Sequence, residues 1–224
     1  MTCAEVMKKL EKLGTAQNRK IYARHGGSGD MFGVSFANLY KLQKQIKTDH
    51  ALARQLWKTR NVDAQWLATM IADPTQMDSK ETDAWAKDNS PGQAVSGLFA
   101  GLVARTQSAP QKMAAWIKSK EEFTRATGYN VMGALLRHDA SALSDAECRK
   151  HLATIEKEIH GSANRARYSM NSAVISIGIY KPALTKEVIE AAKRIGHVEV
   201  DHGETGCKTP DALAYIKKAI ARKK

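Results

Sequence analysis

Four arginines and one tyrosine in the second half of the chain are the side chains best suited to contact a nucleic acid. They are Arg125, Arg137, Arg165, Arg167 and Tyr168. Arg165 and Tyr168 are three residues apart, so on a helix they share a face. A guanidinium beside an aromatic ring suits contact with phosphates and nucleobases. The alternative, which the residues leave open, is a solvated charged face with one tyrosine in the core.

A second cluster, "VDHGETGCK", offers four possible metal ligands: Asp201, His202, Glu204 and Cys207. A tetrahedral site uses His or Cys pairs at short spacing, and no second pair lies nearby in sequence. We therefore expect a turn that packs on the last helices, with Cys207 buried as a small apolar group. Neither a metal nor another cofactor is expected. The glycine-rich stretch 26–33 lacks a following Gly-Lys-Ser/Thr and predicts a flexible loop rather than a phosphate-binding loop.

The charge balance favours a polyanionic partner. The chain has 224 residues, with 35 Lys and Arg against 23 Asp and Glu, which gives a net charge of +12 and a pI of about 9.6. Such a surface attracts nucleic acids, because each phosphate that it neutralises releases condensed counterions. An acidic protein, an anionic membrane or mere solubility also fits this composition.

Cysteine use and hydropathy indicate a compartment. Cys3, Cys148 and Cys207 are an odd, scattered set that fits reduced thiols better than a disulfide framework. The N-terminus has no apolar signal region, and the longest apolar run, at 173–180, is too short to cross a bilayer. We expect a cytoplasmic protein, free or associated with the nucleoid, that has no membrane partner and no obligate protein partner.

Hydrophobic periodicity and helix caps predict an almost entirely helical chain. Asp49, Asn61 and the pair Ser144 and Glu147 are typical helix starts. Only residues 197–201 have the composition of extended chain. The predicted helices are 3–14, 16–26, 35–47, 50–60, 62–73, 79–88, 94–105, 110–118, 121–137, 144–159, 162–180, 185–195 and 210–222.

Short helices joined by brief turns predict stacked helix pairs. We expect an all-α fold, a right-handed superhelix (α-solenoid) of HEAT/ARM-like antiparallel pairs whose concave face would hold a polyanion. Similar "Ala-x-Trp" and "Ala-Trp" cores around Trp66 and Trp116 hint at a repeat of fifty residues. No linker divides the chain, so a single domain over 1–224 is expected.

Four long stretches of the chain resemble the DNA alkylation repair proteins of the AlkD-like class. They are 31–74, 116–136, 164–180 and 192–216. The resemblance implies a superhelix of HEAT-like repeats with a basic concave groove for duplex DNA. It also implies a DNA glycosylase that releases N3- or N7-alkylated purines by stabilising an oxocarbenium-like sugar with a carboxylate and aromatic faces. Arg125 matches a basic residue of this family that contacts the DNA backbone.

The junction "KDNSPGQAVSG" departs from the family pattern. The family segment resembles Lys-Asp-Phe-Asp-x-Trp-Asp-x-x-Asp, in which the tryptophan and the last aspartate act on the sugar. Lys87 and Asp88 match its start, but Gly92 occupies the tryptophan position and Ser96 the aspartate position. A serine hydroxyl does not supply the negative charge that an oxocarbenium ion requires. Lys87 adds a cation to the candidate DNA contacts.

A shifted match gives one alternative for the catalytic pair. If Trp85 serves as the aromatic residue, Asn89 falls four residues on and is uncharged, whereas Asp88 lies three residues on and near the same face. A further aromatic residue of the family would fall at Ser176 or Ile177 and is absent.

The sequence leaves two main function classes, and a third that it favours less. The first is a DNA-binding protein that holds duplex DNA, damaged or branched, and has weak or no activity on simple methylated purines. The second is an active glycosylase that uses another acid, with Asp88 the first candidate and Asp83 or Glu81 behind it. The third is a helical-repeat scaffold for a protein partner.

Overall fold

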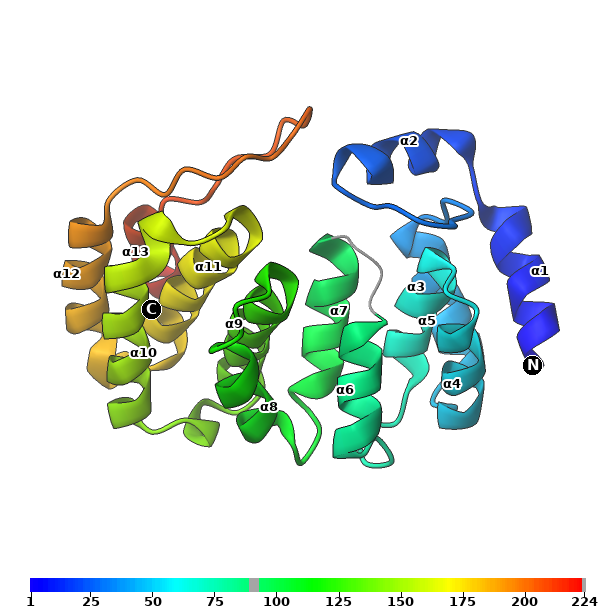
Figure 1. The fold of residues 1–224 in the computed structure, drawn as a ribbon, viewed down its shortest axis with the longest axis horizontal. Coiled ribbons are helices and arrows are strands. Elements are labelled where there is room, and N and C mark those ends of the chain that lie inside the picture. The colour runs from blue at the N-terminus through cyan, green and yellow to red at the C-terminus, as the bar shows by residue number, and fades with distance from the viewer. Residues whose placement is uncertain (89–92, 223–224) are drawn as a thin grey trace. The chain divides into compact units, whose positions relative to one another are not determined.

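The computed structural model describes residues 1–88 and 93–222, and for residues 93–96 it describes the backbone alone. The described residues form thirteen α-helices and three short 3-10 turns, without a β-strand (Figure 1). They fall into two compact units, unit 1 with residues 1–108 and 203–205 and unit 2 with residues 109–202 and 206–224. Within the described ranges, no helix combines the length and hydropathy that a bilayer span requires.

Unit 1 contains α1 (Cys3–Leu13), α2 (Ala16–Arg24), α3 (Phe36–Ile46), α4 (His50–Lys58), α5 (Val62–Ile71), α6 (Ser79–Lys87) and α7 (Gln93–Val103). Unit 2 contains α8 (Ala109–Trp116), α9 (Glu122–His138), α10 (Asp145–Glu158), α11 (Asn164–Tyr180), α12 (Thr185–Ile195) and α13 (Ala212–Ala221). Every predicted helix is present, and each end lies within two residues of its predicted place.

The predicted helix caps are confirmed. Asp49 accepts a hydrogen bond from the Leu52 amide, and Asn61 accepts one from the Ala64 amide. Ser144 and Glu147 form a capping box at the start of α10. These side chains satisfy amides that the first helical turn leaves without partners, so local chemistry sets where the helices begin.

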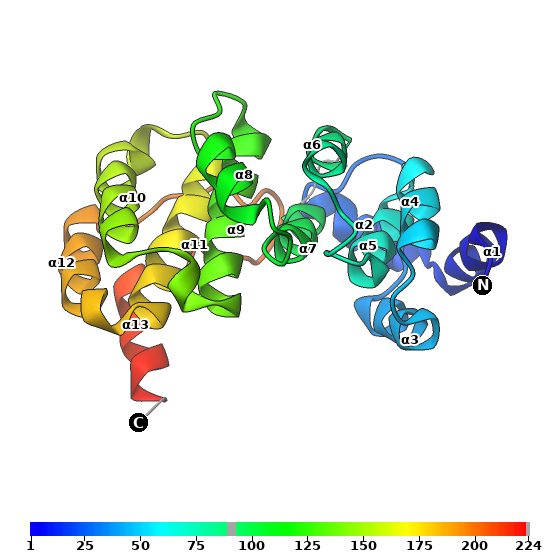
Figure 2. The same cartoon turned by 90° about the horizontal axis from the view of Figure 1, so that it is seen from below.

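In unit 2, α9, α11 and α13 lie side by side and run parallel (Figures 1 and 2). The Glu122 carboxylate accepts a hydrogen bond from the Arg165 amide at the start of α11, and Gly133 faces Ser176 further along the same two helices. Both pairs are 43 residues apart, which is a HEAT-like period of about 40–47 residues. We call these helices the α9–α11–α13 row.

In unit 1, α3 packs on α5 and α5 packs on α7, and we call them the α3–α5–α7 row. Trp66 belongs to this row, whereas Trp116 ends α8, which packs against α9 as the other member of a pair. The two tryptophans are therefore not equivalent positions of a repeat, and the fifty-residue echo does not mark the repeat length.

Asp63 anchors the loop before α3 to α5. The buried carboxylate accepts hydrogen bonds from the amides of Phe32, Gly33 and Val34, at 2.6, 3.0 and 2.7 Å. Burial raises the pKa of Asp63, and the three amide hydrogen bonds oppose that rise. Gly33 has φ +80°, and a Cβ there would lie 2.5 Å from the Thr15 carbonyl oxygen. The expectation of a flexible loop over 26–33 is therefore wrong for its second half.

Replacing Asp63 by Asn should destabilise the protein. The amide NH2 of Asn cannot accept, so at least one buried backbone N–H loses its acceptor, which costs about 2 kcal/mol of unfolding free energy. Urea denaturation of D63N and wild type measures this. The control is E11Q, since Glu11 is exposed and its carboxylate has no partner among the described residues. Equal stability of D63N and wild type would contradict this role.

Candidate nucleic-acid interface

Carboxylates are scarce on the helices of the two rows. The sequences of α3, α7, α11 and α13 contain none, α5 contains Asp63 and α9 contains Glu122. Both of these carboxylates accept hydrogen bonds from backbone amides. The rows therefore carry little negative charge that would repel a phosphate.

The α10 and α12 helices, which are the other members of the pairs in unit 2, differ from the row helices in their charges. In α10 and α12, Arg149 forms a bidentate ion pair with Glu187, at 2.8 and 2.9 Å, and Arg194 forms another with Glu156. Hydrogen bonds from the arginines lower the pKa of both carboxyls.

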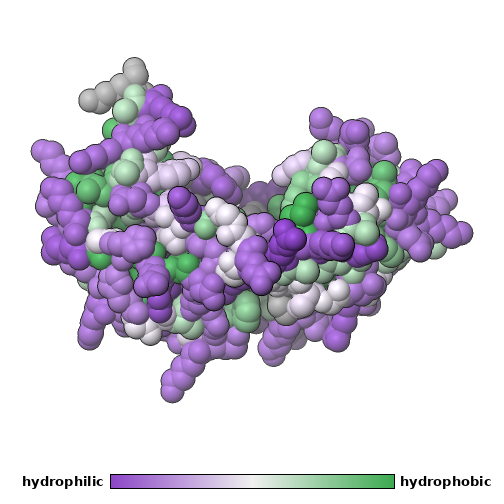
Figure 3. Space-filling view, turned by 90° about the horizontal axis from the view of Figure 1, so that it is seen from above, coloured by the Kyte–Doolittle hydropathy of each residue, from purple (hydrophilic) through white to green (hydrophobic). Residues whose placement is uncertain are grey.

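The face drawn in Figure 3 is hydrophilic over most of its area, and its hydrophobic areas are small.

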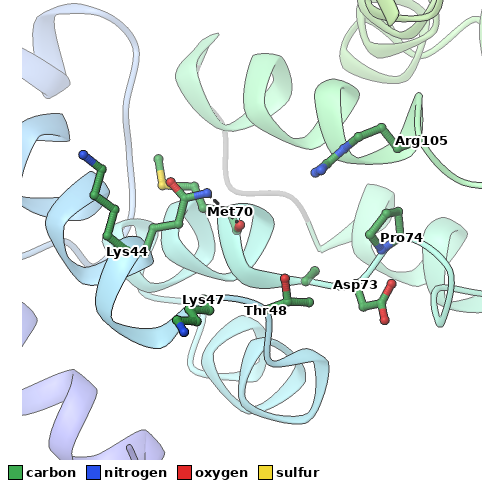
Figure 4. Close-up of a pocket in the computed structure, with 9 residues that line it drawn as sticks. Lys44, Lys47, Thr48, Met70, Asp73, Pro74 and Arg105 are labelled. Atoms are coloured by element: carbon green, nitrogen blue, oxygen red, sulfur yellow. Dashed lines mark hydrogen bonds between the residues drawn. The ribbon is translucent and has the colours of Figure 1, made fainter.

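A cationic pocket of about 530 Å³ lies at the C-terminal ends of the α3–α5–α7 row. Lys44, Lys47 and Arg105 line it, together with Asp73. Figure 4 shows Arg105 reaching towards Met70 while the two lysines lie on the α3 side. The Asp73 carboxylate accepts hydrogen bonds from Gln76 and Thr75, which lower its pKa. Neither lysine ammonium has a hydrogen-bond or ion-pair partner in the part of unit 1 that the structure describes.

Sequence reasoning missed this pocket. Arg105 is separated from the lysines by more than one helix pair, and nothing in the sequence shows that they share a cavity. The available signal was the absence of any Asp or Glu from the basic segment 35–47.

Arg125 forms an ion pair within unit 2. Its guanidinium donates to the Glu158 carboxylate at the end of α10, and 23% of its side chain is exposed. Burial opposes the charge, but the hydrogen bond to Glu158 outweighs it and raises the pKa of Arg125. A phosphate at this position would share Arg125 with Glu158.

Arg165 and Tyr168 lie on the same face of α11, where the structure places both in partly exposed positions. The Arg165 guanidinium has no partner among the described residues. Tyr168 packs edge-on against His202, with ring centroids 5.7 Å apart. Burial raises the pKa of Tyr168, and Cys207 and Tyr215 act in the same direction.

Arg167 and Arg137 are placed apart from Arg165. Arg167 donates to the Ser162 and Glu199 carbonyl oxygens at 2.8 to 3.2 Å, so it fastens the chain after α12 to the start of α11. Arg137 is exposed in the last turn of α9, about 18 Å along the helix from Arg125. The structure therefore brings Arg125 and Arg165 to one edge of unit 2 and Arg137 to the other.

Trp85 is a core residue of unit 1. Only 5% of it is exposed, and its ring stacks on Trp57 at 4.2 Å with 6° between the planes. Asp88 is the C-cap of α6, with 47% of its side chain exposed, and it pairs with Arg60 at 3.3 Å. Lys87 is exposed beside it. Of the candidate catalytic pair, Trp85 is therefore in the core, whereas the Asp88 carboxylate is exposed to solvent.

The other candidate acids differ from Asp88. Glu81 accepts two hydrogen bonds from Arg54 at 2.8 Å and lies 3.2 Å from His50 Nε2. Burial opposes its ionisation, but the contacts with Arg54 and His50 prevail and lower the pKa of Glu81. Asp83 is partly exposed on the same helix. Gly92 and the side chain of Ser96 lie outside the described residues.

The family's last aromatic position falls on small or buried groups. Ser176 is partly exposed on α11 and donates to the Ser172 carbonyl oxygen, whereas Ile177 is buried. The surface between α9 and α11 is therefore lined here by a hydroxyl and by Gly133.

The prediction that Cys207 is buried is wrong, since the thiol is exposed. Its neighbours in the turn have other roles: the His202 ring lies 3.0 Å from the Thr209 hydroxyl, and the Asp201 backbone exchanges hydrogen bonds with Asn164. The turn is held by polar contacts, which leave the sulfur at the surface.

Comparison with known proteins gives consistent matches along the chain. The model of the family described as DNA alkylation repair enzyme matches residues 6–216. The uncharacterized protein Lin0241 of Listeria innocua is 32% identical over 219 residues, with 95% of each chain covered, and Lmo0209 of Listeria monocytogenes is 31% identical over 221 residues, with 96% covered.

A solved structure matches with a TM-score of 0.90 and 28% identity, and covers 100% of this chain and 95% of that chain. It is described as a new family of proteins related to the HEAT-like repeat DNA glycosylases with affinity for branched DNA structures. The predicted all-α fold of HEAT-like helix pairs and the predicted family resemblance are both confirmed.

Glu81 should stabilise the fold in a pH-dependent way. Its folded pKa is depressed, so its stabilisation is present above its ordinary pKa and is lost as the pH falls through the folded value. We expect E81Q to lower the unfolding free energy by about 1 kcal/mol at neutral pH, with a difference that shrinks below about pH 4. Urea denaturation across this range measures it, with exposed Glu199→Gln as control. A difference independent of pH would contradict the ion-pair role.

Proposed function

Since the chain belongs to the DNA alkylation repair enzyme family, we propose that it is a DNA-binding protein that holds the phosphodiester backbone along its two rows. We include branched duplexes among its targets. We do not propose that the protein carries out the family's excision chemistry. A single family model spans both units, which supports treating residues 1–224 as one DNA alkylation repair domain.

The observation that carries this proposal is the distribution of charge. The row helices contain two carboxylates, both bonded to backbone amides, whereas Lys44, Lys47 and Arg165 are cations with partly or fully exposed side chains. Phosphates approach such a surface without repulsion and displace counterions from the DNA. The α10 and α12 helices, with their ion-paired arginines, offer less free positive charge.

The proposed DNA class follows from the solved relative, which is described as having affinity for branched DNA. Binding through the backbone does not require an intact base stack, so it suits strands that change direction at a branch. No metal or other cofactor enters this proposal.

The proposed loss of excision rests on the family positions and on the remaining acids. Gly92 and Ser96 offer neither an aromatic face nor a carboxylate. Asp88 is ion-paired with Arg60, and Glu81 is ion-paired with Arg54. The exposed Asp88 carboxylate is the one feature that favours the alternative, an active glycosylase, and so it is the residue to test.

Neutralising the cationic pocket should weaken DNA binding. We expect the triple variant K44Q/K47Q/R105Q to lose at least tenfold in affinity for duplex and branched DNA, and its salt slope to fall by about 2 to 3, because each lost phosphate contact removes about 0.9. Fluorescence anisotropy at several salt concentrations measures both quantities.

The matched control removes the same charge from the α10 and α12 side. Lys150, Lys157 and Lys186 are exposed there. K150Q/K157Q/K186Q should bind within about twofold of wild type. Equal losses in the two triple variants would mean that net charge alone matters, and a salt-independent affinity of wild type would end the proposal.

Incubation with methylated DNA should release no 3-methyladenine or 7-methylguanine above the spontaneous rate. The physical reason is that Gly92 and Ser96, at the family's catalytic positions, supply no carboxylate to stabilise positive charge on the sugar. Chromatography of the free bases measures the release, and D88N should equal wild type. Release by wild type that D88N abolishes would establish the glycosylase alternative instead.

A further inference from the structure

Tyr40 is an exposed aromatic residue on α3, in unit 1. It is 49% exposed, and neither its ring nor its hydroxyl has a partner among the described residues. Tyr22 of the same unit, in contrast, packs edge-on against Trp66 at 4.9 Å and donates to the Val34 carbonyl oxygen. Exposing a ring of this size to water sacrifices hydrophobic stabilisation. The fold of unit 1 therefore makes no use of the exposed ring.

Two lysines share the exposed face of α3 with Tyr40. Tyr40, Lys41 and Lys44 are all exposed, and their spacing places them within a sector of about 100° around the helix. Leu39 and Leu42, on the opposite side of α3, are buried, and α3 packs on α5. The side of α3 that is turned away from the core thus carries one ring and two cations.

Lys47 extends this face to the end of α3. It follows Lys44 by about one turn, and both lysines line the cationic pocket (Figure 4). The backbone of Lys47 has φ +66° and ψ −133°, a combination that glycine adopts at much lower cost. A lysine that occupies such a position indicates a use for its ammonium group. We call Tyr40, Lys41, Lys44 and Lys47 the tyrosine–lysine face.

The carboxylates near this face are few, and they are hydrogen-bonded. α3 contains none, and its caps are Ser35 and Lys47. Beyond its end, Asp49 accepts from a backbone amide of α4, and Asp73 of the pocket accepts from two residues that follow it. None of the three lysine ammonium groups has an ion-pair partner in the part of the chain that the structure describes. The tyrosine–lysine face therefore attracts a polyanion.

Resting on the proposed DNA binding, we propose that the tyrosine–lysine face binds the single-stranded arm of a branched DNA. Tyr40 stacks on an unpaired base, while Lys41, Lys44 and the cationic pocket bind the neighbouring phosphates. Aromatic rings among cations bind single strands in this way, because every unpaired base offers a π-face. An intact duplex hides its base faces inside the helix, so Tyr40 adds affinity only where a base is free.

Continuity with the cationic pocket favours a nucleic acid over an acidic peptide. Lys44 and Lys47 belong both to the face and to the pocket lining, and Tyr40 lies about one turn before Lys44. A strand whose phosphates occupy the pocket therefore continues past the ring. An acidic peptide would use the lysines alone, since its carboxylates offer nothing that stacks on Tyr40.

The test compares three fluorescent DNAs: a linear duplex, a three-way junction with a single-stranded thymidine arm, and the same junction with an arm of abasic sites. The two arms carry the same charge, so the difference between them isolates the base. Anisotropy gives the affinity of wild type, Y40A and Y40F for each DNA. The matched control is Y215A, because Tyr215 is a similarly exposed ring, at 52%, on α13 of unit 2. Circular dichroism melting checks that these surface variants fold.

We expect Y40A to lose about tenfold in affinity for the thymidine arm, as the loss of one stacking contact does, and less than about twofold for the duplex and the abasic arm. Y40F keeps the ring and should bind as wild type does, and so should Y215A. Wild type should bind the thymidine arm more tightly than the abasic arm, whereas Y40A should bind both arms equally.

Lys47→Gly separates a lysine that binds DNA from one that supports the fold. Glycine relieves the backbone at φ +66°, so K47G should resist urea at least as well as wild type. It should nevertheless bind the thymidine arm several-fold more weakly, because one phosphate contact is lost, and K47R should bind as wild type does. A less stable K47G, or one with wild-type affinity, would overturn this part of the inference.

Failure of the inference and failure of the proposed function are distinguishable. If wild type binds DNA in a salt-dependent way but prefers neither arm, or if Y40A matches wild type on the thymidine arm, the inference is overturned and the proposed function stands. An equal loss by Y40A on the linear duplex overturns it in the same way. If wild type binds none of the three DNAs, the proposed function itself fails.

Discussion

The close approach of neighbouring helices in unit 2 is the constraint on which the rest of that unit depends. A Cβ at Gly133 would lie 2.9 Å from the Ser176 hydroxyl oxygen, and one at Gly128 would lie 2.6 Å from the Ile117 amide nitrogen. A Cβ at Gly178 would meet the Ile216 side chain at 2.8 Å. Small residues at these three junctions let α8, α9, α11 and α13 pack in succession, and interiors packed this closely do not tolerate added atoms without a shift.

Parallel packing of this kind places cations and most carboxylates on different helices. Equivalent helices of successive pairs present the same ends to the same edge, so Arg165 comes to lie beside the start of α9. On α10 and α12, the other members of the pairs, Glu187 is used in an ion pair with Arg149 and Glu156 in one with Arg194. A chain with a net charge of +12 thereby keeps the surface of its row helices almost free of negative charge, which is the condition for a phosphate backbone to approach.

Local patterns in the sequence predict the helices well, because their starts depend on adjacent residues such as Asp49 and Asn61. Such local patterns do not predict contacts between segments that are far apart in the sequence. Asp63 accepts from amides some thirty residues away, so neither its burial nor the anchored loop before α3 follows from the sequence. For the same reason the stacking of Trp85 on Trp57, the exposure of Cys207 and the pocket beside Arg105 emerge only from the fold.

The central claim is that DNA lies on the rows and not on the α10 and α12 side. Mass-spectrometric footprinting of lysine amines, with and without branched DNA, measures this directly. The account predicts that DNA reduces the reactivity of Lys44, Lys47 and Lys218 several-fold and leaves Lys150, Lys157 and Lys186 unchanged. Protection of the second set, or uniform protection of both, would contradict it.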